Sequence, residues 1–179
     1  MNAYQPHTIH RGIHRRVEAD FHYVGMGEVR VGSRGELLQA TLGSCVGIAL
    51  LWEKGGRCGL AHCLLPAAPG PMIRIGARYV SQGVRSLVAM LGAAPADYPD
   101  VKVIIAGGAR MLRTRAGVPN VGELNAQAAL RHLAECGLRV SHIDVGGRRP
   151  RQLLIDCADQ RFVINPIERP FEGIDHDCY

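Results

Sequence analysis

A cysteine and a histidine stand out as two side chains that can do covalent chemistry together. Cys45 follows a Leu-Gly-Ser stretch, and His62 lies seventeen residues later, just before Leu-Leu-Pro. A free thiol has a pKa of about 8.5, so a nearby imidazole must accept its proton before it becomes a strong nucleophile at neutral pH. The residue types predict a nucleophile and its base, provided that the fold brings them together.

The segment between the two residues predicts whether they can meet. The apolar runs CVGIALLWE and RCGLAHCLLP are expected to be strands joined by a turn at KGG, since glycine accepts positive φ cheaply. A Lys54-Gly55 loop places His62 opposite Gly47, with Cys45 as its diagonal neighbour at about 7–8 Å between Cα atoms. A Gly55-Gly56 loop shifts the pairing by two residues and keeps the same face, whereas a three-residue loop turns His62 away.

Attack of a thiolate on a carbonyl also needs hydrogen-bond donors for the oxyanion. Gly43 and Ser44 can bend the chain so that backbone N–H groups converge, and we expect the amides of Ser44 and Cys45 to fill this role. A buried cysteine is, however, often only a small apolar residue, and a histidine in a strand is often only a packed one.

A structural zinc site is a third interpretation of the same segment. Four residues of suitable type lie close in sequence: Cys45, Cys58, His62 and Cys63. No C-x-x-C pair is present, and adjacent residues in a strand point to opposite faces, so the pattern favours the absence of a metal.

The elements that must position these residues follow from periodicity. Apolar residues at helical spacing predict two helices, at about 76–92 and about 122–136, ended by Gly92 and Gly137. Other apolar runs, such as VKVIIAGGA at 101–109, indicate seven or eight strands in short consecutive runs. The sequence therefore predicts an α/β fold of the α+β type, a layered sandwich of mixed or antiparallel sheet with two main helices on one face.

Length and composition predict one domain between two polar ends. The chain has 179 residues, of which 47% are hydrophobic and 21% charged, enough for a single core. We expect a basic N-terminal extension at 1–20, a single domain at 21–167 and a C-terminal tail at 168–179. The histidines of the extension, His7, His10 and His14, fit a mobile segment better than a metal site.

The same composition narrows location and partners. No apolar run approaches the length of a membrane helix, and the N-terminus has no apolar signal segment, so we expect a cytoplasmic protein without membrane insertion. The six cysteines have no disulfide-framework spacing and are expected to be reduced. The net charge of +5 suits an acidic partner, while aromatic residues at 5% of the chain argue against nucleic acid.

Several motifs in order resemble the CheD family of chemoreceptor glutamine deamidases. LGSCVGIAL is followed by AHCLLP at the family's Cys-to-His distance, and ARYV, VIIAGGARML, VGELN and IDVGGRRPRQLLID come later. The resemblance spans about residues 21–165, and so many ordered motifs make it specific.

The resemblance implies a CheD-like fold and an amidohydrolase that uses no metal or organic cofactor. Cys45 corresponds to the family nucleophile and His62 to its histidine. Thr41 is the counterpart of an orienting threonine, although it lies closer to the cysteine than is usual. The implied substrates are glutamine side chains on the cytoplasmic domains of methyl-accepting chemotaxis receptors, and a CheC-type phosphatase is an implied partner of some members.

Two other functions fit the same residues. A binding module with this fold would dock on a CheC-type phosphatase or a receptor without catalysis, and would be indifferent to loss of Cys45. A cysteine protease or other thiol hydrolase would cleave peptide bonds instead.

Overall fold

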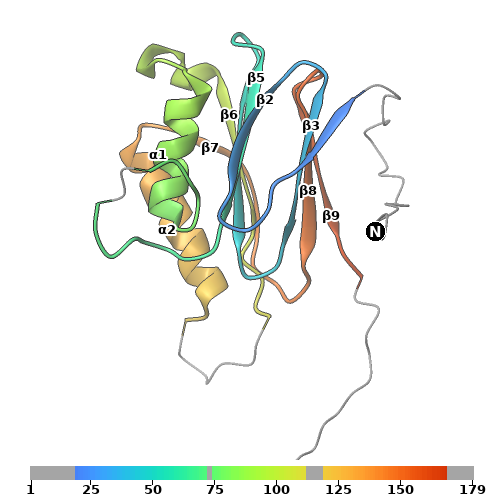
Figure 1. Cartoon of the computed structure of the whole chain (residues 1–179). Helices are drawn as coiled ribbons and strands as arrows, with labels where there is room; N and C mark the ends of the chain where they lie inside the picture. The colour runs from blue at the N-terminus through green and yellow to red at the C-terminus, as the bar shows by residue number, and fades with distance from the viewer. Residues whose placement is uncertain (1–18, 72–73, 112–118, 169–179) are drawn as a thin grey trace, which may run out of the picture.

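The computed structural model describes residues 19–71, 74–111 and 119–168, which stack in three layers (Figure 1). Two helices form the first layer and cover one face of a five-stranded sheet. A four-stranded sheet packs against the other face. This arrangement confirms the predicted layered sandwich with two helices on one side.

Nine strands and two α-helices make up the described ranges. In chain order they are β1 (Asp20–Tyr23), β2 (Val29–Ser33), β3 (Glu36–Leu42), β4 (Val46–Trp52), β5 (Arg57–Cys63), α1 (Val80–Leu91), β6 (Val101–Gly107), α2 (Val121–Glu135), β7 (Val140–Val145), β8 (Arg151–Asp156) and β9 (Arg161–Pro166). A short 3₁₀ helix, Pro95–Asp100, precedes β6 and was not expected from the sequence. No helix in these ranges has the length and apolar character needed to cross a membrane.

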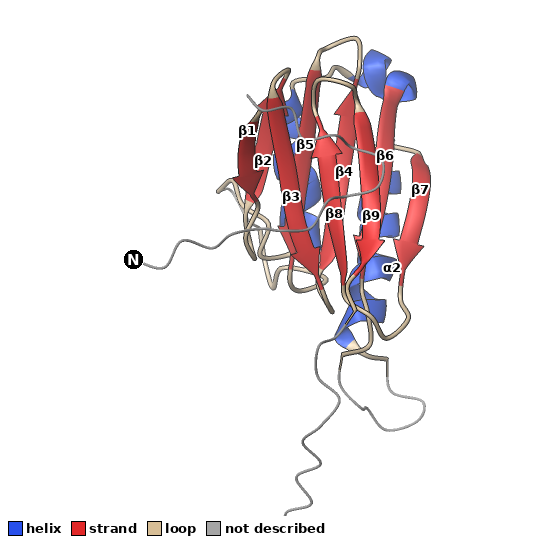
Figure 2. Cartoon of the chain, turned by 90° about the vertical axis from the view of Figure 1, so that its right-hand side faces the viewer, coloured by secondary structure: helices blue, strands red, loops and turns tan. Residues whose placement is uncertain are grey.

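Both sheets are mixed. The four-stranded sheet has the order β1-β3-β8-β9, with β1 parallel to β3 and the other pairs antiparallel. The five-stranded sheet has the order β2-β5-β4-β6-β7, with β6 parallel to β7. Figure 2 looks onto the four-stranded sheet, with the helices behind both sheets. The hairpin that carries the two candidate residues, β4–β5, therefore lies in the middle layer.

The core has two apolar layers, one on each side of the five-stranded sheet. Val46, Ile48 and Leu50 of β4 face the helices, while Ala49 and Leu51 face the second sheet. Because both faces of this strand are covered, its sequence VGIALLW is almost continuously apolar rather than alternating. Burial on both sides makes this hairpin a rigid support for the residues at its end.

The helices lie where periodicity predicts them. Helix α1 begins at Val80, four residues later than expected, and ends at Leu91. It is capped by Gly92, whose φ of 77° is the left-handed conformation that glycine adopts without strain. Helix α2 begins at Val121, after Asn120 has capped it by accepting a hydrogen bond from the Glu123 N–H. Most of the predicted N-terminal extension, with its three histidines, and nearly all of the tail lie outside the described residues.

Candidate active site

The β4–β5 hairpin has the register of a Lys54-Gly55 turn. The Gly56 N–H donates to the Glu53 carbonyl at 3.0 Å, and His62 pairs directly with Gly47. This confirms the first of the two predicted registers. Cys45 immediately precedes β4, two residues before Gly47, and so comes at the end of the strand diagonally next to His62.

The face of the hairpin that carries His62 looks toward the second sheet. A Cβ on Gly47 would lie 2.7 Å from Leu42 Cδ1 and 3.4 Å from Leu153 Cδ2, both in the layer between the sheets. Glycine at position 47 therefore leaves room for Leu42 beside the imidazole, where any side chain would overpack this layer.

The His62 ring has a defined tautomer. Its Nδ1 lies 3.1 Å from the Val24 carbonyl oxygen, and a carbonyl can only accept, so Nδ1 carries the proton. The other nitrogen, Nε2, is buried and has no hydrogen-bond partner among the described residues. Burial lowers the pKa of His62, which is only 2% exposed, and the Val24 carbonyl opposes this shift only in part. The ring is thus neutral near pH 7, with a free lone pair on Nε2.

The segment after β1 is anchored to β3 and holds the backbone of His62. The Val24 N–H donates to Gln39 of β3, the Gly27 N–H donates to the His62 carbonyl, and the His62 N–H donates to the Glu28 carbonyl, all at 2.7–2.9 Å. The backbone of His62 is therefore fixed on both sides by the same short segment that orients its ring.

The turn that carries Cys45 is held by its carbonyl groups. Three consecutive carbonyls accept hydrogen bonds from residues far along the chain: Gly43 from the Ala109 N–H at 2.8 Å, Ser44 from Asn125 Nδ2 at 3.0 Å and Cys45 from the Gly108 N–H at 2.7 Å. In the ranges that the structure describes, no other residue accepts a hydrogen bond from the N–H of Ser44 or Cys45, and the Cys45 N–H faces its own thiol. The predicted oxyanion donors are therefore not committed to another described residue.

Asn125 joins the two ends of the candidate site. Its Nδ2 donates to the Ser44 carbonyl and, at 2.8 Å, to the Leu64 carbonyl, two residues after His62. The side chain is fully buried in α2. Sequence reasoning did not assign it a role, although a polar amide among the apolar positions of a helix is a signal that a buried acceptor needs it.

Glycine lets β6 approach the Cys45 turn. Gly107 has a φ of 104°, and a Cβ there would clash with the Cys45 carbonyl oxygen. Gly108, with a φ of 63°, packs in the same way against Gly122 of α2. The Gly-Gly pair thus brings the sheet, the helix and the Cys45 turn into backbone contact.

The Cys45 thiol is half-buried, and burial raises its pKa above the ordinary value. Because burial lowers the pKa of His62 at the same time, both shifts favour the uncharged partners. The directions of these pKa shifts therefore favour a neutral thiol and a neutral imidazole at rest.

Thr41 lies apart from His62. Its neighbours along β3, Ala40 and Leu42, are buried between the sheets, so by strand alternation the Thr41 side chain points to the outer face of the four-stranded sheet. The group that accepts from His62 is the Val24 carbonyl instead. The alternating apolar residues of ELLQATL were the signal that could have predicted this orientation.

The other cysteines of the segment are dispersed. Cys63 faces α1, because a Cβ on Gly83 of that helix would lie 2.6 Å from its sulfur. Cys58 is buried between the two sheets. Among the described residues, no group of three or more His, Cys, Asp or Glu side chains is arranged to hold a metal ion.

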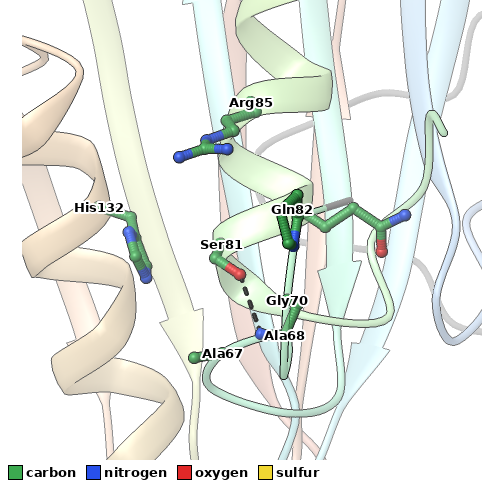
Figure 3. A pocket seen from close by; sticks show the side chains of 8 residues that line it. Ala67, Ala68, Gly70, Ser81, Gln82, Arg85 and His132 are labelled. Atoms are coloured by element: carbon green, nitrogen blue, oxygen red, sulfur yellow. Dashed lines mark hydrogen bonds between the residues drawn. The ribbon is translucent and has the colours of Figure 1, made fainter. Parts of the chain in front are cut away.

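A hollow of about 300 Å³ lies between the helices and the loop after β5 (Figure 3). Arg85 of α1 and His132 of α2 point into it from opposite sides, and the Ser81 hydroxyl accepts from the Ala68 N–H at 3.2 Å. Neither Cys45 nor His62 lines this hollow. It is therefore separate from the candidate cysteine and histidine.

Comparison with known proteins points to one family. A family model described as CheD chemotactic sensory transduction matches residues 64–166, more than half of the chain. That match begins after His62, so it rests on the scaffold and not on the candidate residues themselves.

Curated relatives extend the match. A "Probable chemoreceptor glutamine deamidase CheD" of Bdellovibrio bacteriovorus is 36% identical over 136 residues, which cover 75% of this chain and 87% of the relative. A "Probable chemoreceptor glutamine deamidase CheD 2" of Ruegeria sp. is 31% identical over 172 residues, covering 86% of this chain and 96% of the relative. Among solved structures, a DUF152 protein of Neisseria meningitidis has a TM-score of 0.41 at 11% identity, covering 73% of this chain and 64% of its own, which is too distant to bear on function.

Proposed function

Because the chain belongs to the CheD family, we propose that it is a chemoreceptor glutamine deamidase that uses Cys45 as nucleophile and His62 as base. The observation that carries the chemical part is the tautomer of His62. With Nδ1–H donated to the Val24 carbonyl, the buried Nε2 is left as a proton acceptor at the end of the hairpin where Cys45 immediately precedes β4.

In the first half of the proposed reaction, His62 Nε2 takes the thiol proton as Cys45 Sγ attacks the δ-carbon of a glutamine side chain. Proton transfer accompanies attack, since the directions of both pKa shifts favour the neutral pair at rest. The uncommitted amides of Ser44 and Cys45 donate to the oxyanion. Collapse of the tetrahedral intermediate moves the proton from Nε2 to the leaving nitrogen, which departs as ammonia and leaves a thioester.

In the second half, His62 Nε2 removes a proton from water, and the resulting hydroxide attacks the thioester carbon. The Cys45 thiolate leaves, takes back the proton from His62, and releases a glutamate side chain. In this proposal the Val24 carbonyl, rather than Thr41, holds the imidazole in the required tautomer, as the third group of a hydrolase triad does.

We place the reaction in the cytoplasm, on the cytoplasmic domains of chemotaxis receptors, because the curated relatives are named for chemoreceptors. A CheC-type phosphatase is a further proposed partner. The alternative of a binding module without catalysis makes the opposite prediction for Cys45, since docking alone does not need a thiol.

Mass spectrometry of a chemoreceptor cytoplasmic fragment tests the proposal. The intact protein should increase the mass of selected glutamine-containing peptides by about 1 Da, the difference between an amide and an acid. Cys45→Ala and His62→Ala should abolish the conversion while leaving the far-ultraviolet circular dichroism unchanged. Conversion that persists without Cys45 would rule out the nucleophile, and cleavage of the fragment would indicate a protease.

A further inference from the structure

A second hollow, of about 270 Å³, adjoins the Cys45 turn. Its lining comes from three places: Gly108 and Arg110 after β6, Asn120 and Glu123 at the start of α2, and residues 146–148 after β7. Gly108 belongs to both sites, since its N–H donates to the Cys45 carbonyl at 2.7 Å. The hollow lies on the β6–β7 side of Cys45, whereas His62 lies on the β5 side.

One residue that lines the hollow has a buried donor that lacks an acceptor. Asn120 is 7% exposed, and its Oδ1 accepts from the Glu123 N–H at 3.1 Å, which holds the side chain over the first turn of α2. Its Nδ2 has no hydrogen-bond partner in the described part of the chain. The positive end of the fifteen-residue helix α2 lies at the same place. A buried donor at a helix N-terminus is suited to an anionic acceptor.

The charges around the hollow also favour an anion. Arg110 donates to Glu123 Oε1 at 2.7 Å, and this arginine lowers the pKa of the Glu123 carboxyl, so the two form a neutral pair. Arg148 is exposed and forms no ion pair with a described residue. One positive charge is therefore left over at the rim.

We propose that this hollow binds the carboxylate of an aspartate or glutamate side chain on the protein substrate, near the glutamine that Cys45 attacks. The proposal rests on the deamidase function and adds to it a recognition site for the substrate. Adjacent strands are about 4.8 Å apart, so the ends of β6 and β7 lie roughly 5–10 Å across the sheet from the strand of Cys45. In a helical substrate this distance corresponds to an acidic residue about one turn from the target glutamine.

Deamidation kinetics on a chemoreceptor cytoplasmic fragment test the site. Arg148→Ala should raise KM about three- to tenfold, the usual worth of one hydrogen bond at an exposed site, with kcat within about twofold. Arg149→Ala is the matched control, because Arg149 is also exposed, carries the same charge and does not line the hollow. It should leave KM within about twofold. Equal effects of the two variants, or none, would overturn the proposal.

Asn120→Asp examines the buried donor without removing the helix cap. Aspartate caps a helix as well as asparagine does, so the melting temperature should be retained, while the donor is lost and a negative charge enters the hollow. KM should rise by more than tenfold, and an unchanged KM would contradict the assignment.

The source of the carboxylate is tested from the substrate side. Each aspartate or glutamate within about seven residues of the converted glutamine is replaced in turn by its amide. At one position the replacement should raise KM for the wild-type enzyme but not raise it further for Arg148→Ala, because both changes remove the same contact. Effects that add at every position would overturn the proposal. The affinity of the fragment can also be measured without turnover, by comparing the Cys45→Ala protein with the double variant that carries Arg148→Ala as well. A failure of deamidation itself is thereby distinguished from a failure of this site.

Discussion

Replacing Asn125 by alanine should both destabilise the protein and slow catalysis, because it removes the two hydrogen bonds that its side chain donates. The side chain is fully buried and donates to the carbonyls of Ser44 and Leu64, which flank the two candidate residues. Two hydrogen bonds at about 1 kcal/mol each give a loss of about 2 kcal/mol, and unpaired carbonyls add to it. Alanine returns at most about 0.7 kcal/mol as a better helix former. We therefore expect the free energy of unfolding to fall by about 1.5–3 kcal/mol.

Urea unfolding followed by the fluorescence of Trp52, the single tryptophan, measures this loss. Gln127→Ala is the matched control, since Gln127 is an exposed amide two residues along the same helix and should change stability by less than about 0.5 kcal/mol. Under native conditions, the Asn125 variant should also lose about ten- to hundredfold in kcat, because a small displacement of Cys45 from His62 is costly.

The pH profile of alkylation of Cys45 by iodoacetamide separates positioning from stability. A displaced turn changes the surroundings of the thiol and should shift the profile, whereas a purely structural loss leaves it in place. Wild-type kcat and an unshifted profile in a folded Asn125→Ala protein would refute the view that these hydrogen bonds position the site, even if stability falls as expected.

Three further perturbations follow from the geometry. Burial holds the pKa of His62 below 6.5, so the unfolded chain binds a proton at this histidine before the folded protein does as the pH falls. The free energy of unfolding should therefore decrease progressively below about pH 6.5. Urea unfolding at pH 5–8 should show a smaller decrease in His62→Gln. An unchanged pH slope in His62→Gln would contradict the assignment. Gly107→Ala should cost about 2–4 kcal/mol by thermal unfolding, more than Gly56→Ala, whose φ is also positive but whose added Cβ meets nothing within 4 Å. Equal losses would disprove the contact with Cys45. Thr41→Val should keep deamidation within about twofold in the mass-spectrometric assay, and a large loss would restore Thr41 to the site.

The local parts of this structure could be predicted from sequence because their causes are local. Glycine at the β4–β5 turn fixed the register that places His62 opposite Gly47, and the 3.6-residue periodicity located both helices. The apolar residues Ala40 and Leu42 on either side of Thr41 also predict that its side chain points to the opposite face of the strand. The family resemblance suggested instead that Thr41 orients the histidine.

The rest of the candidate site depends on backbone groups and distant contacts. A carbonyl such as that of Val24 is the same in every residue type, so no sequence pattern marks it as the partner of His62. Likewise, the bond from Asn125 to Ser44 joins residues 81 positions apart, and only the packing of α2 on the sheet brings them together. The division of nine described strands between two sheets has the same long-range origin.

The way in which the Cys45 turn is held has a consequence for the order of folding. The β4–β5 hairpin can form from neighbouring residues, but the carbonyls of Gly43, Ser44 and Cys45 find their donors in the two residues just after β6 and in α2. Contacts of such high sequence separation form late, because a long loop must close first. A growing chain on the ribosome therefore carries the cysteine and the histidine long before it carries an organised site. Reactivity of the thiol should appear only after α2 has docked.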